Sequence, residues 1–134
     1  MPLVSRILIK ASMIYLLVGL LIGVLMLINK AFFISPVFWF LIPAHIEIMI
    51  FGWIIQFTMG VAYWIFPRFL KDKSRGAAKP ANLMPVLLNA GIILVVISDL
   101  MAWNGVALTG RVFELSAVLI FMGLHWKRVV TYNK

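Results

Sequence analysis

Three polar side chains stand inside one long apolar stretch, residues 42–69, and they are the groups in this chain best placed to do chemistry. They are His45, Glu47 and Gln56. Polar groups in hydrocarbon cost free energy, so they are rare in membrane helices and usually functional. His45 is one of only two histidines, and a neutral imidazole is a common metal ligand. His45 is therefore the first candidate for a ligand-binding residue.

A helical wheel of 3.6 residues per turn places His45 on a side that is polar or small. That side also carries Met49, Gly52, Gln56, Met59, Gly60 and Tyr63. Small residues let a neighbouring helix or a flat cofactor approach closely. This side suits a haem lying edge-on beside His45, with contacts from Gly52, Gln56, Gly60 and Tyr63. Alternatively, the glycines only pack helices and His45 hydrogen-bonds a neighbour.

Glu47 points to nearly the opposite side of the same helix, because it follows His45 by two residues. Its carboxyl group could ligate a metal, relay protons or be buried in protonated form. It could instead reach interfacial water, since it lies only four residues past Pro43. These alternatives stay open at the level of sequence.

Two further groups are candidate ligands, His125 and Arg111. His125 adjoins Trp126-Lys127-Arg128 near the end of the last predicted helix, residues 111–126. It is expected about 20 Å below the start of that helix, at the opposite end of the helical bundle from His45. His45 and His125 of one chain are therefore not expected to hold the same haem, and an interfacial histidine is the favoured interpretation. Arg111 is one turn from Glu114, so a structural ion pair is favoured over contact with a haem propionate.

The composition restricts the class of protein. The chain has 134 residues, of which 64% are hydrophobic and 12% charged, so an integral membrane protein with a single domain, residues 1–134, is expected. The absence of cysteine excludes disulfides, thiolate metal sites and covalent c-type haem. No nucleophile–base arrangement or phosphate-binding glycine loop is present, so hydrolase and nucleotide-binding functions have no support.

The net charge of +8 follows membrane topology rather than nucleic-acid binding. Ten of the twelve basic residues lie in three segments, at residues 6–10, 68–79 and 127–134, and only Lys30 and Arg111 lie elsewhere. This alternation is the positive-inside pattern, which places both termini in the cytoplasm. We expect a multi-pass protein of a prokaryotic inner (plasma) membrane.

Four membrane-spanning helices are predicted, at about 11–28, 43–66, 83–103 and 111–126, in an all-α up-and-down bundle. Ser35-Pro36 is expected to start an aromatic interfacial piece, because serine caps helices and proline suits the first position. Pro43 should kink or restart the helix, and Pro67 should end it. Residues 68–80 form the expected cytoplasmic loop.

The fragments Ala44-His45, Phe51-Gly52-Trp53, Gly60-Val61-Ala62-Tyr63 and Pro67-Arg68 resemble the second transmembrane helix of haem–copper oxidase subunit I. The likeness is greatest to the nitric oxide reductase and C-type oxidase branches. It implies that His45 is an axial ligand of haem b, and that the four helices correspond to one arc of that subunit.

The resemblance also implies an assembly. Three copies could form an oxidase-like ring with haem between chains and Glu47 facing the neighbouring haem, so a trimer is favoured and a dimer is the alternative. The superfamily's catalytic subunit has several metal-binding histidines whereas this chain has two, so oxygen reduction by one copy is not expected and no enzymatic activity is assigned.

The leading hypothesis is a haem b protein for electron transfer to a redox partner, or for binding a diatomic gas such as NO or O₂. Glu47 and His125 are the weaker candidates for the second iron ligand. One alternative is a small transporter or channel subunit that uses Glu47. Another is a non-catalytic accessory subunit of a respiratory complex.

Overall fold

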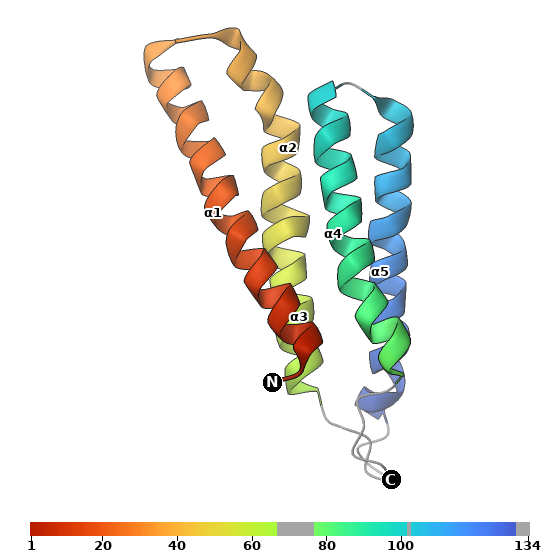
Figure 1. Ribbon diagram of the computed structural model, residues 1–134. Coiled ribbons are helices and arrows are strands. Elements are labelled where there is room, and N and C mark those ends of the chain that lie inside the picture. The colour runs from red at the N-terminus through yellow and green to blue at the C-terminus, as the bar shows by residue number, and fades with distance from the viewer. Residues whose placement is uncertain (67–76, 102, 131–134) are drawn as a thin grey trace.

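The computed structural model describes residues 1–66, 77–101 and 103–130, and within them it is all-helical (Figure 1). Helix α1 covers Leu3–Phe32, α4 covers Ala78–Met101 and α5 covers Asn104–Val130. Between α1 and α4 runs a segment built of four consecutive pieces. These are the 3₁₀ helix η1 (Pro36–Leu41), α2 (Ile42–Glu47), the π-helix η2 (Ile48–Ile55) and α3 (Gln56–Ile65).

The turn between α1 and η1 is held by a buried asparagine. Asn29 accepts a hydrogen bond from the Phe33 backbone N–H at 2.7 Å through its carbonyl. Its side-chain oxygen accepts another from the Ser35 N–H at 2.8 Å. Phe33 takes a left-handed conformation with φ of 45°, which is common just after the last residue of a helix. These bonds fold η1 back beside the end of α1.

The helix signals around Ser35 and Pro43 act as predicted. The Ser35 hydroxyl accepts from the Val37 N–H at 3.3 Å and caps η1, and Pro43 stands in the first turn of α2. At the other end, α3 stops at Ile65. Phe66 there has ψ of 138°, the extended conformation imposed on a residue that precedes proline.

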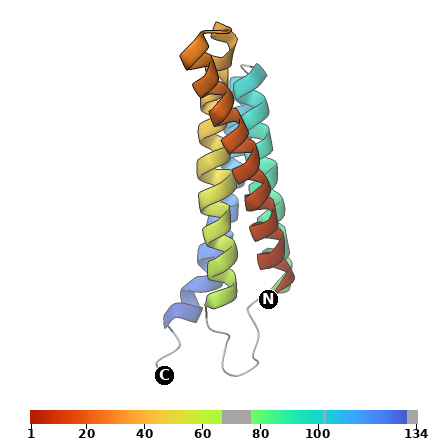
Figure 2. The same cartoon turned by 90° about the vertical axis from the view of Figure 1, so that its left-hand side faces the viewer.

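The helices run alternately up and down in two pairs. Helix α1 packs along η2 and α3, α4 packs most extensively along α5, and α2 and η2 join the pairs through α4. Figure 1 shows α4 and α5 side by side, and Figure 2 shows the chain's first helix and the end of α3 meeting at the same end of the bundle. The start of α1, the end of α3, the start of α4 and the end of α5 lie together. We call this the basic end, because Arg6, Lys10, Lys79 and Arg128 stand there. The expected loop at 68–80 lies mostly outside the described residues.

Within the described residues, four helical segments of 22 to 30 residues are long and apolar enough to cross a membrane. Each exceeds the roughly 20 residues that a bilayer requires. The first and last helices are longer than predicted, since α1 begins at Leu3 rather than residue 11 and α5 begins at Asn104 rather than residue 111. Helix α4 begins earlier than predicted, at Ala78, but ends at Met101 rather than residue 103. Their outward faces expose large apolar side chains, such as Leu17 and Leu21 of α1 and Leu119 of α5. These features are consistent with a multi-pass membrane protein.

Candidate functional site

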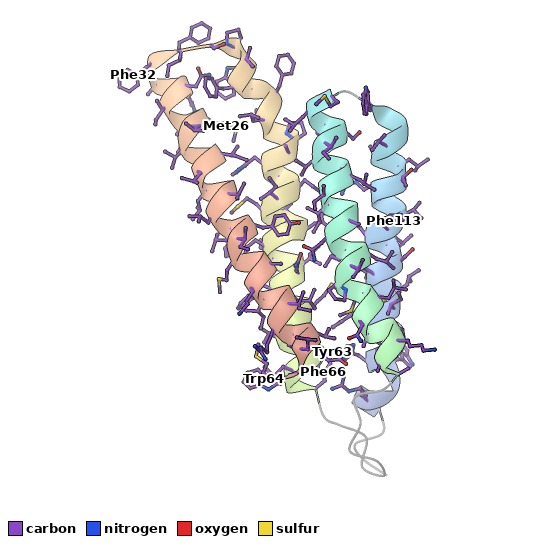
Figure 3. The ribbon with its side chains drawn as sticks, viewed as in Figure 1. Met26, Phe32, Tyr63, Trp64, Phe66 and Phe113 are labelled. Carbon is purple, nitrogen blue, oxygen red and sulfur yellow. The ribbon has the colours of Figure 1, made fainter. Side chains whose placement is uncertain are left out.

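Buried polar groups occur at three levels of the bundle. By their places in the helices, Glu47 and Glu114 lie toward the end opposite the basic end, and Gln56 lies near the middle. His125 lies near the basic end beside Tyr63, which Figure 3 labels. Each level joins different helices.

His45 projects from α2 toward α1. It is half-buried, and its Nδ1 atom is buried without a hydrogen-bond partner among the described residues. The ring faces Gly23 of α1, where an added Cβ would lie 3.1 Å from His45 Cε1. A larger residue at Gly23 would therefore displace the imidazole.

A groove of about 380 Å³ lies beside His45, between α1 and the η1–α2 piece. It is lined by Gly23, Met26, Leu27, Lys30, Trp39, Ile42 and His45. Its walls are mostly apolar, and Lys30 contributes a cation at one end. Sequence reasoning did not predict Met26, Lys30 and Trp39 as residues of this groove. Lys30 could have been singled out, because it lies outside the three basic segments.

The side of η2 and α3 that carries Gly52 and Gly60 faces α1. A Cβ on Gly52 would lie 2.7 Å from Tyr15 Cγ, and a Cβ on Gly60 would lie 3.0 Å from Leu8 Cβ. In this structure the side chains of α1 occupy the space that a flat cofactor would need there. Gly52 and Gly60 thus serve helix packing, the alternative interpretation of their spacing.

Gln56 bonds across three helices rather than into a cavity. Its Nε2 donates to the Leu8 carbonyl at 3.4 Å and to Asn89 Oδ1 at 3.3 Å. Asn89 in turn donates to the Pro85 carbonyl at 2.7 Å. These bonds tie α3 to α1 and α4 at mid-bundle.

Glu47 faces α5, on the other side of the helix from His45. Its Oε2 lies 2.7 Å from Arg111 Nη1, and Glu114 Oε2 lies 2.8 Å from the same nitrogen. The predicted Arg111–Glu114 pair is confirmed. The expectation that Glu47 could reach interfacial water is wrong, because only 3% of Glu47 is exposed. Two carboxyl groups on Arg111 disfavour a propionate contact at this guanidinium.

His125 is near the basic end, as predicted, but it is not an exposed interfacial residue, because only 3% of it is exposed. The rings of Tyr63, Phe66 and Phe121 surround its imidazole at centroid distances of 5.4, 5.1 and 4.1 Å. Tyr63 follows His45 by 18 residues, which corresponds to about 27 Å of helix. This separation agrees with the expectation that the two histidines do not share one haem.

Comparison with known proteins adds no identification: no family model matches the chain, and neither does any curated protein or solved structure. Within the described residues, no three histidine, cysteine or acidic side chains gather to hold a metal ion.

Proposed function

We propose that the protein binds haem b in a membrane, with His45 as an axial ligand of the iron and the groove between α1 and α2 as part of the haem site. The observation that carries the proposal is the buried, unpartnered nitrogen of His45 beside this groove. A neutral imidazole with an unused lone pair is a good iron ligand, and the mostly apolar walls suit a porphyrin.

The residues of the groove fit the parts of a haem. His45 supplies a nitrogen, Lys30 can pair with a haem carboxylate, and Trp39 and Ile42 give an apolar wall. Bound haem supplies one-electron transfer, or diatomic gas binding where one axial position is open. Burial of the site would tune the reduction potential.

In this proposal the second axial ligand of the iron comes either from Met26 of the same chain or from a neighbouring copy. Glu47 is engaged by Arg111 on the far side of α2, and His125 is too distant, so neither suits that position. Met26 lines the same groove, and a thioether is an accepted haem ligand. Otherwise a neighbouring copy supplies the ligand in a homo-oligomer, with a trimer favoured over a dimer.

An absorption spectrum tests the haem proposal directly. Wild-type protein produced with ample haem should show a Soret band, and His45→Ala should lose it. His125→Ala is the matched control and should keep it, because His125 lies near the basic end. A colourless wild type would instead favour a transporter or an accessory subunit.

The orientation is part of the same proposal. We place the basic end in the cytoplasm of a prokaryote, because Arg6, Lys10 and Lys79 flank apolar helices there. The haem groove then lies toward the outer face of the inner membrane.

A further inference from the structure

His125 presents an unused hydrogen-bond acceptor near the basic end of the bundle. Its Nδ1 lies 2.6 Å from the Phe121 carbonyl oxygen, a distance that requires Nδ1 to carry the proton and donate it. Nε2 of the neutral ring then holds a lone pair. This atom is buried without a hydrogen-bond partner among the described residues. A buried acceptor without a donor is costly, so this position suits a ligand with a donor group.

The surroundings of His125 are aromatic. Tyr63 meets the imidazole edge-on at an interplanar angle of 80°, and Phe66 and Phe121 are tilted by 57° and 36°. Aromatic side chains pack well against a further ring, in offset or edge-to-face geometry. The cage therefore favours a planar ring over an aliphatic chain.

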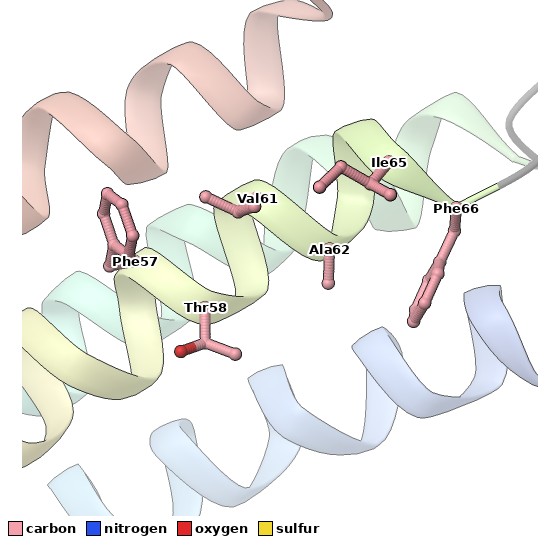
Figure 4. A pocket seen from close by; sticks show the side chains of 6 residues that line it. All are labelled: Phe57, Thr58, Val61, Ala62, Ile65 and Phe66. Carbon is pink, nitrogen blue, oxygen red and sulfur yellow. The ribbon is translucent and has the colours of Figure 1, made fainter.

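A groove on the surface of α3 borders this cage at Phe66. It measures about 350 Å³ and is lined by Phe57, Thr58, Val61, Ala62, Ile65 and Phe66 (Figure 4). Phe66 belongs to both features, because it closes the groove and contacts His125. Its side chain points toward α5 in Figure 4. The groove is open and lies on a helix that is apolar enough to face lipid.

The Phe66 side chain separates the groove from the aromatic cage formed around His125 by Tyr63, Phe66 and Phe121. Arg128 Nη2 donates to the Phe66 carbonyl at 2.5 Å and anchors the backbone there. Phe66 itself has an extended backbone, with ψ of 138°, after the last turn of α3. The site inferred below requires the phenyl ring to rotate about its side-chain bonds, so that the groove opens toward His125.

We infer that the α3 groove and His125 bind a membrane-soluble aromatic alcohol, a phenol or hydroquinone, whose hydroxyl donates to His125 Nε2 and whose ring packs against Phe66. Three properties select this class. The apolar groove admits a molecule from lipid, the cage accepts a planar ring, and the lone pair requires a donor. The site is separate from the haem proposal and does not depend on it.

Imidazole ¹⁵N NMR of the whole protein in lipid nanodiscs tests the inference, because the chain has only two histidines to label. His125→Gln assigns the signals. The free protein should show His125 with Nδ1 protonated and Nε2 as an open acceptor. Trimethylhydroquinone should move the Nε2 signal toward its hydrogen-bonded position, saturably. The dimethyl ether of this probe has the same ring without a donor and should not.

Ala62→Phe is the variant that blocks the groove, since Ala62 lines it. It should abolish the shift caused by trimethylhydroquinone, whereas Leu119→Phe on the exposed face of α5 should leave that shift intact. Four results would overturn the inference: a proton on Nε2 in the free protein, no shift at saturating probe, an equal shift with the ether, or a shift that survives in Ala62→Phe. The signals of the unliganded variants show whether each has folded around His125.

Discussion

Arg111 is the residue on which the charge balance of the bundle depends. One of its nitrogens holds the carboxyl groups of both Glu47 and Glu114, and its guanidinium also lies 5.2 Å from the centre of the Phe51 ring. Both glutamates are nearly fully buried. Removing the arginine leaves two buried acidic groups without a cation, which is far more costly than losing an exposed ion pair.

We expect Arg111→Leu to destabilise the protein by about 3 kcal/mol, and Arg111→Lys to lose much less, because lysine keeps the charge. Glu47→Gln and Glu114→Gln should each cost less than Arg111→Leu, since each leaves the guanidinium one carboxyl partner. Unfolding by dodecyl sulfate in mixed micelles, followed by circular dichroism, gives the free energies. An Arg111→Leu variant as stable as wild type would show that the cluster does not stabilise the bundle.

One of the two ion pairs in this cluster, between Arg111 and Glu114, was predictable from the sequence. Arg111 and Glu114 are three residues apart on one helix, so their pairing follows from helix geometry. Glu47 comes from a different helix pair, and nothing in its local sequence names its partner. The burial of His125 was missed for the same reason, because Tyr63 and Phe66 come from α3.

At the scale of elements, glycines set how closely the helices approach. A Cβ on Gly91 of α4 would lie 2.8 Å from the Gly110 carbonyl oxygen of α5, and a Cβ on Gly110 would lie 2.6 Å from Val95 Cγ2. Because the first of these contacts is with backbone, the two helices would have to separate to admit a methyl group.

Gly91→Ala should therefore destabilise the α4–α5 pair by about 1–3 kcal/mol through overpacking. Gly123→Ala is the matched control on α5, because a Cβ there would meet no heavy atom of the described residues within 4 Å. It should be neutral or gain up to about 1 kcal/mol of helix propensity. Thermal unfolding of both variants in the same detergent checks the difference, and equal midpoints would refute this account of the packing.

Element positions were predictable where the signal is local. Ser35-Pro36 and Pro43 start η1 and α2 through capping and the fixed φ of proline, which act on neighbouring residues. The first helix was predicted to start too late. Residues 3–10 contain no helix breaker after Pro2, so α1 extends back to Leu3. The π-helix at Ile48–Ile55 carries no such mark, although it stands between the buried Glu47 and Gln56, and π-helical turns are frequent at functional sites.

At the scale of the whole molecule, the described residues form a groove beside His45 and an apolar exterior. The groove lies between α1 and α2, so a second copy could cover it while the outward faces meet lipid. The four apolar helices were predictable, because spanning length is visible in the sequence. Their orientation in a membrane stays a prediction from the distribution of basic residues. The assembly was not predictable, since one chain does not contain its neighbours.

We expect purified protein to be a trimer with one haem per chain, or a dimer if the ligand arrangement differs. Light scattering coupled to gel filtration gives the mass, and a pyridine haemochrome assay gives the stoichiometry. His45→Ala separates the two claims, because it should lose haem whether or not the oligomer persists. A haem-free monomer would contradict both the assembly and the cofactor.

The contact between Glu47 and Arg111 also joins parts of the chain that are synthesised at different times. Glu47 belongs to the first helix pair and Arg111 to the second, so the ribosome makes the acid long before its cation. On insertion into the proposed membrane in chain order, the first pair would carry a carboxyl group in hydrocarbon without its counter-charge, a state that membranes disfavour. We expect the nascent first half to keep Glu47 near water until the last helix is synthesised.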